Sequence, residues 1–68
     1  MDSTVIKPMI DYVTYVVKPS KLDFWTWYHT DVEGGKLIAE SDYISNNNRI
    51  VREWIDFGTF GISLLTAN

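Results

Sequence analysis

The feature that most constrains this chain is an aromatic cluster followed by paired glycines. The sequence reads FWTWYH over residues 24–29 and reaches two adjacent glycines at 34–35. Aromatic and β-branched residues favour strands, and glycine supplies the positive φ angles that tight hairpin turns need. We therefore predict a β-hairpin in this region, around which a small core condenses.

The length allows one small domain. We expect residues 1–68 to form that domain, with 1–8 as a loose N-terminal leader that ends at a proline. A domain of this size buries only about 60% of the surface that its unfolded chain exposes. The absence of cysteine excludes disulfides and thiolate metal sites. Three Trp, four Tyr and three Phe partly compensate for the small core, because each ring buries a large area.

The charge balance narrows the classes of partner. Six basic residues oppose nine acidic ones, for a net charge of −3, which disfavours binding that rests on many phosphate contacts. No apolar run approaches the roughly 20 residues of a membrane span, and the first residues lack the pattern of a signal peptide. We expect a cytoplasmic protein that binds no membrane.

Four segments have the composition of strands. Residues 9–18 are rich in β-branched and aromatic side chains, and a turn at Pro19 follows them. Further strands are expected at 23–30, 36–42 and 60–65.

A helix is expected between the last two of these strands. Ser45 is a good N-cap residue, and Gly58 has the position of a C-cap glycine. Between them, the apolar residues Ile50, Val51, Trp54 and Ile55 recur at helical spacing, which places Trp54 in the core beneath the helix. The predicted fold is therefore α+β, in the order β-β-β-α-β: a small antiparallel sheet of three to four strands with one helix packed on one face.

Part of the sequence resembles a known family. Residues 35–41 read GKLIAES, residues 43–45 read YIS, and Trp25 and Trp27 precede them in an aromatic segment. These motifs, which cover about half of the chain, resemble a single unit of the YegP-like family of small uncharacterised proteins. The resemblance implies an aromatic strand, a glycine hairpin, a further strand and a helix capped at Ser45. It also implies a homodimer, because the family pairs such units, and it implies no catalytic residues.

No catalytic, metal-binding or cofactor-binding set is expected. His29 is the single histidine, and a catalytic role would need an organised pocket with a second partner. Carboxylates flank the predicted hairpin, but without calcium-loop spacing they are better explained as a solvated rim. The serines lack the glycine context of a nucleophile elbow.

The aromatic cluster is the expected binding site. A sheet has two faces and one helix covers only one of them, so the second aromatic face must be exposed or lie in an interface. The residues predicted to bind on this aromatic sheet face are Trp25, Trp27, Tyr28 and His29.

The predicted function is that of a small, non-catalytic protein-interaction module. We expect a homodimer that also binds another protein, in the manner of an accessory or inhibitor protein of phage or mobile-element type. The alternative is single-stranded nucleic-acid binding, in which bases stack on the aromatic sheet face.

Overall fold

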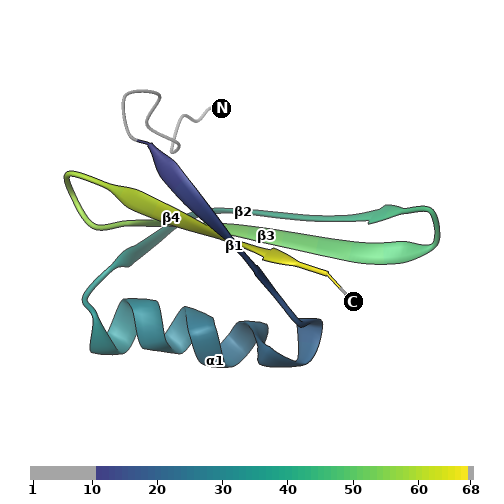
Figure 1. The fold of residues 1–68 in the computed structure, drawn as a ribbon, viewed down its shortest axis with the longest axis horizontal. Helices are drawn as coiled ribbons and strands as arrows, with labels where there is room; N and C mark the ends of the chain where they lie inside the picture. The colour runs from purple at the N-terminus through teal and green to yellow at the C-terminus, as the bar shows by residue number, and fades with distance from the viewer. Residues whose placement is uncertain (1–10, 68) are drawn as a thin grey trace.

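The computed structural model describes residues 11–67 as a four-stranded sheet with a helical segment against one face (Figure 1). The elements, in chain order, are β1 (Tyr12–Val17), a 3-10 turn (Pro19–Lys21), α1 (Leu22–Trp27), a π-helical turn (Tyr28–Val32), β2 (Lys36–Ser45), β3 (Asn48–Asp56) and β4 (Gly61–Thr66). The two turns continue α1 at either end, so residues 19–32 form one helical segment. The fold class is thus α+β, as predicted, with one helix packed on one face of a sheet.

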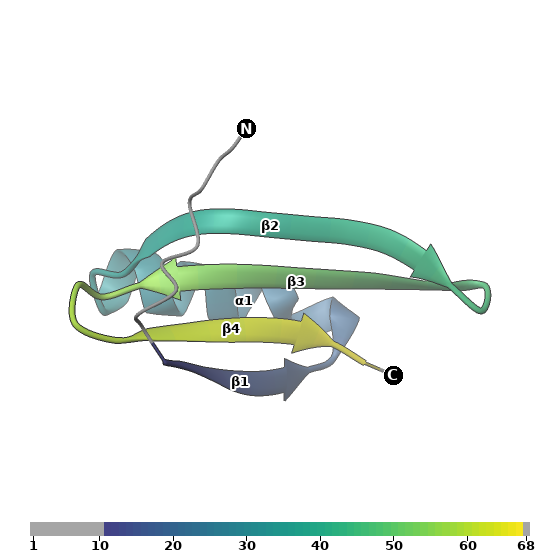
Figure 2. The ribbon, with the colours of Figure 1, turned by 90° about the horizontal axis from the view of Figure 1, so that it is seen from above.

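The strands lie in the order β1-β4-β3-β2 (Figure 2). β1 runs parallel to β4, while β4 with β3 and β3 with β2 are antiparallel pairs. The sheet is therefore mixed and not wholly antiparallel. β1 and β2 lie at opposite edges, and the helical segment makes the crossover between them.

The core lies between the helical segment and the two central strands. Its buried apolar members are Leu22, Val51, Ile55, Ile62 and Leu64, with Val17 and Phe57 packed against them. Side chains in β3 alternate, so that Val51, Glu53 and Ile55 are buried on the helix side. This alternation of buried and less buried side chains has a period of two residues, which fits a strand with one face against the helix.

The prediction of a strand at 23–30 is wrong, because these residues are helical. Pro19 stands at the first helical position, where its fixed φ is favourable. Leu22, Thr26 and His29 then recur at helical spacing on the side that faces the sheet. Gly34, at φ +84°, follows the end of the helical segment and is not part of a hairpin turn.

The predicted helix after Ser45 is also wrong, because the chain makes a hairpin there. Asn46 and Asn47 have φ angles of 51° and 65°, the pattern of a two-residue type I′ turn. Ser45 is not a helix cap, since it ends β2 and pairs with Asn48. Gly58 is not a C-cap either, because it lies at φ +100° in the turn between β3 and β4.

The element order is therefore β-α-β-β-β, and the expected order β-β-β-α-β is wrong. The strands predicted at 36–42 and 60–65 are confirmed as β2 and β4. The first predicted strand is confirmed over β1, and its residues 9–10 lie outside the described part, as does the predicted leader 1–8. Within residues 11–67, no helix has the length and apolar character needed to cross a membrane.

Candidate functional site

The four predicted binding residues lie on the helical segment, not on a strand, and the helical period separates them into two sets. Trp25 and His29 line a cavity against the sheet. Trp27 and Tyr28 lie on the side of the helix that points away from the sheet. The aromatic sheet face predicted from the sequence is therefore wrong. Two surfaces replace it, and their rings touch where Phe24 meets Trp25, with centroids 4.9 Å apart, and where Tyr28 meets His29, at 5.4 Å.

The first surface is the outer aromatic face of the helical segment, formed by Phe24, Trp27 and Tyr28. Ring centroids of Phe24 lie 5.8 Å from those of Trp27 and 6.4 Å from those of Tyr28. Phe24 is 50% exposed and Trp27 is 49% exposed. The carboxylate residue Asp31 follows one turn after Trp27 on the same side and is exposed. The face is thus apolar and has an acidic edge.

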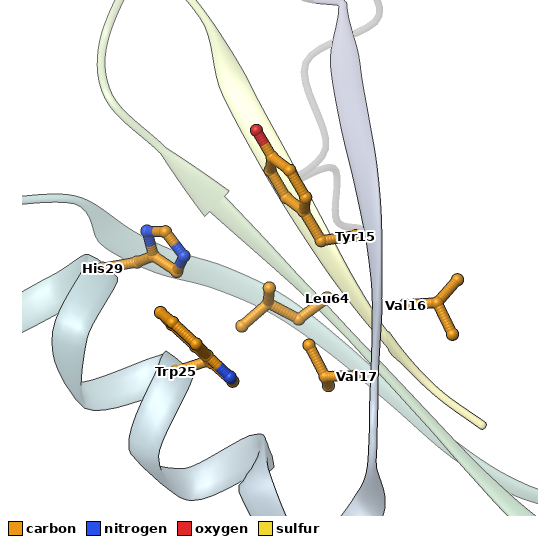
Figure 3. Close-up of a pocket in the computed structure, with 6 residues that line it drawn as sticks. All are labelled: Tyr15, Val16, Val17, Trp25, His29 and Leu64. Carbon is orange, nitrogen blue, oxygen red and sulfur yellow. The ribbon is translucent and has the colours of Figure 1, made fainter. Parts of the chain in front are cut away.

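The second surface is a cavity of about 420 Å³ between the helical segment and strands β1 and β4 (Figure 3). Its lining residues are Tyr15, Val16, Val17, Trp25, His29 and Leu64. Tyr15, Val17 and Leu64 point toward the helix, where Trp25 and His29 face them, while Val16 points away on the other side of β1. The lining is mainly apolar and aromatic.

A neighbouring cavity of about 490 Å³ shares Tyr15 and His29 with the first. It is lined in addition by Glu33, Phe57, Phe60 and Ile62. The rings of Phe57 and Phe60 stack on each other, with centroids 4.9 Å apart and planes 12° apart. We refer to the two adjacent cavities together as the aromatic cleft; Tyr15 and His29 line both of them, and Glu33 lines the second.

His29 is held in place by Glu33. Its Nδ1 lies 2.5 Å from Oε1 of Glu33, one helical turn later. The imidazole is largely buried, whereas the Glu33 side chain is 40% exposed. The rings of Tyr15 and His29 are near parallel, with centroids 6.4 Å apart. This pair is a polar contact in a cleft whose other described lining residues are mainly apolar or aromatic.

Glu53 is a buried carboxyl group at the other end of the helical segment. It is 6% exposed and accepts a hydrogen bond from the hydroxyl of Thr26. Burial raises the pKa of Glu53, and the neighbouring carboxyls of Glu40 and Asp23 raise it further. This group contributes to the contact between helix and sheet and is separate from the aromatic cleft.

Trp54, predicted in the core beneath the helix, lies instead on the sheet face opposite the helix. It is half-buried, and the guanidinium of Arg52 lies 5.0 Å from its ring centroid. Arg52 also donates to the hydroxyls of Ser63 and Thr14, at 3.2 and 3.1 Å. Trp54 therefore belongs to a polar and aromatic network on the open face.

Of the cleft residues, the sequence identified Trp25 and His29 as binding residues, and the aromatic residues that it missed are Tyr15, Phe57 and Phe60. The alternation of Tyr15 with Val17 was visible, but the partner of that strand face was not. Phe57 and Phe60 flank the turn that contains Gly58, and their stacking depends on that turn. The sequence signal for this part of the cleft was thus one aromatic residue on each side of a turn that contains glycine.

Over residues 11–67, no group of three or more His, Cys, Asp or Glu side chains is placed to hold a metal ion. Comparison with family models, curated proteins and solved structures finds nothing that matches this chain. The resemblance to the YegP-like family therefore stays a prediction, and the aromatic strand and capped helix that it implied are a helix and a hairpin in the structure.

Proposed function

We propose that this protein is a non-catalytic protein-interaction module whose outer aromatic face binds the partner. The observation that carries the proposal is the exposure of Phe24 and Trp27 on the side of the helix that no other described element covers. Large apolar side chains that cluster on a surface mark interaction sites, and Trp and Tyr are enriched among residues that dominate binding energy.

Two kinds of partner fit this proposal, and both would bind the same face. A second copy of the chain would bring two apolar faces together as a homodimer. A different protein would be bound by an accessory or inhibitor of phage or mobile-element type, in the cytoplasm. The part of the chain that the structure describes has a small core of five buried apolar residues, which supports either kind of partner, since domains of this size often gain stability from a partner.

Single-stranded nucleic acid is the less favoured ligand. Base stacking would use the same exposed rings, but exposed Asp23 and Asp31 lie on the helix beside them. A phosphate backbone would be repelled by these carboxylates. Binding of a protein through the rings agrees better with the negative charge of these carboxylates than binding of a nucleic acid does.

Photo-crosslinking tests the proposal. A benzophenone side chain is placed at Trp27 in one variant and at Thr59, an exposed residue of the turn between β3 and β4, in the control. Illumination is carried out in the cells that produce the protein. We expect protein adducts of defined mass from position 27 and none from position 59.

The adducts also identify the kind of partner. An adduct of two copies supports the homodimer, and sedimentation equilibrium of the purified protein should then give the mass of a dimer. A nuclease-sensitive adduct would support nucleic-acid binding instead. No adduct at position 27, or the same adducts at both positions, would contradict the proposal.

A further inference from the structure

We propose that the aromatic cleft binds an organic ammonium ion with an apolar body, the ammonium group at the Glu33 end and the body in the inner cavity. This inference concerns the side of the helical segment that faces the sheet. It is independent of the outer aromatic face, so either proposal can fail without the other.

The size of the cleft fits a small molecule. Its two cavities measure about 420 and 490 Å³, within the range of roughly 300–1,000 Å³ that ligand sites occupy. Tyr15 and His29 line both cavities, so the two lie side by side, and the proposed ligand occupies both. A mainly apolar lining with few polar groups is the usual character of such sites.

The charge of the lining favours a cation. Among the described residues that line either cavity, Glu33 is the single carboxylate and there is no Lys or Arg. Its Oε1 contacts His29, which leaves its other oxygen able to accept from a ligand. Tyr15, Phe57 and Phe60 supply aromatic faces at the same end. Aromatic faces attract ammonium groups through their negative quadrupole.

The inner cavity fixes the orientation of the ligand. Val17, Leu64 and Trp25 offer it no acidic group, and a charged group placed there would lose its hydration without compensation. An apolar or aromatic body is stabilised at that position by burial. The ammonium group therefore lies toward Glu33, and the body lies toward Trp25.

Matched probes test the charge preference. The purified protein is titrated with 2-phenylethylammonium, with the neutral isostere 2-phenylethanol and with the anion 3-phenylpropionate. Two-dimensional NMR follows the indole N–H of Trp25 in the cleft and that of Trp54 on the opposite sheet face. We expect saturable shifts at Trp25 with the ammonium probe, at least threefold weaker binding of the alcohol, little binding of the anion, and no change at Trp54.

Two variants of carboxylate residues near the C-terminal end of the helical segment test the role of Glu33. Glu33→Gln should weaken binding of the ammonium probe by roughly three- to tenfold and leave binding of the alcohol unchanged. Asp31→Asn, outside the cleft, is the control and should change neither. Phe60→Leu, at a residue 54% exposed, should also weaken binding of the ammonium probe. Circular dichroism of each variant verifies the fold.

A further titration distinguishes two sources of the ammonium group, a lysine side chain of another protein and a free amine. N-acetyl-lysine methylamide that binds as tightly as 2-phenylethylammonium indicates a lysine side chain of another protein, and weaker binding indicates a free amine. The proposal is overturned if no probe binds, if the alcohol binds as tightly as the ammonium ion, or if Glu33→Gln leaves the ammonium affinity unchanged.

Discussion

The hydroxyl of Thr26 lies between two acceptors, the backbone carbonyl of Leu22 at 2.9 Å and the carboxyl group of Glu53. A hydroxyl has a single proton to donate, so it cannot serve both acceptors at once. The hydrogen bond that Thr26 donates to Glu53 favours the charged carboxylate, whereas burial favours the protonated form and outweighs it. The contact between helix and sheet at this point is therefore coupled to the protonation of a buried residue.

This coupling predicts that the domain loses stability as the pH rises. Burial is the main reason why the pKa of Glu53 lies above its ordinary value of 4.5, and the nearby carboxyls of Glu40 and Asp23 add to it. A group whose pKa is raised in the folded state stabilises the fold below its unfolded pKa, and that contribution disappears as the pH passes the folded pKa. Urea unfolding between about pH 4.5 and 8 should show the decline.

Glu53→Gln is the matched variant for this pH dependence. It keeps the shape and removes the ionisation, so we expect higher stability than the parent at pH 8 and a flatter pH profile. Asp42 is a useful contrast, because its hydrogen bonds from Arg49 lower its pKa and so favour the fold at higher pH. Stability that rises with pH in the parent, or an unchanged slope in Glu53→Gln, would contradict the assignment.

The two neighbours Ile55 and Trp54 should differ in what they contribute to stability. Ile55 is completely buried beneath the helical segment, so Ile55→Ala should cost about 3–5 kcal/mol. Trp54 is larger but half-buried on the open face, where Arg52 covers it. Trp54→Ala should cost roughly 1–2 kcal/mol. Urea denaturation that gave the larger loss for Trp54→Ala would mean that the open face is the true core.

Ile55 and Val51 show why the sequence misplaced the helix. Val51 and Ile55 are four positions apart, and this spacing fits one side of a helix and one face of a strand equally well. In the strand, Glu53 lies between them on the same buried face. A pattern of hydrophobic residues does not predict a buried acid at that position. The partner that makes its burial possible, Thr26, is 27 residues away.

The aromatic segment was wrongly predicted as a strand because its intrinsic propensity was considered without its packing. Its rings have high strand propensity, but propensity is weak against packing context. The decisive local signals were Pro19 at the helix start and the spacing of Leu22 and Thr26, which set the helix face. The class α+β, the helix on one face and strands β2 and β4 could be predicted because they rest on composition and alternation. The cleft could not, because its walls come from β1, the helical segment and the turn after β3.

Gly35 is predicted to be less tolerant of alanine than Gly34. A Cβ at Gly35 would lie 2.5 Å from Cγ2 of Ile55 and 2.7 Å from the backbone oxygen of His29. The carbonyl of His29 accepts the Gly35 amide at 2.9 Å, so it cannot move without losing a hydrogen bond. Gly35→Ala should therefore cost about 2–3 kcal/mol.

Gly34→Ala is the control for the backbone effect. Gly34 has φ +84° but open space around its Cα, so alanine there should cost only about 1 kcal/mol. Chemical denaturation of the two variants gives the order directly. Equal losses would show that backbone conformation, and not the contact with Ile55 and His29, determines the glycine requirement.

Asn47 is predicted to be a site where glycine stabilises the protein. Its φ of 65° is in the left-handed region, where glycine is unstrained and a residue with Cβ pays a steric cost. Asn47→Gly should raise the free energy of unfolding by about 0.5 kcal/mol, and Asn47→Ala should lower it by about 1 kcal/mol. In a domain of this size, 1 kcal/mol corresponds to a shift in Tm of roughly 4–8 °C.

Asn48→Gly separates the turn from the general effect of glycine. Asn48 is the first residue of β3 and pairs with Ser45 in the hairpin. Glycine there gains nothing from a left-handed conformation and loses backbone entropy on folding, so Tm should fall. Opposite signs for Asn47→Gly and Asn48→Gly in thermal unfolding are the expected result. A fall in Tm for both would mean that the type I′ turn is not the conformation that joins β2 to β3.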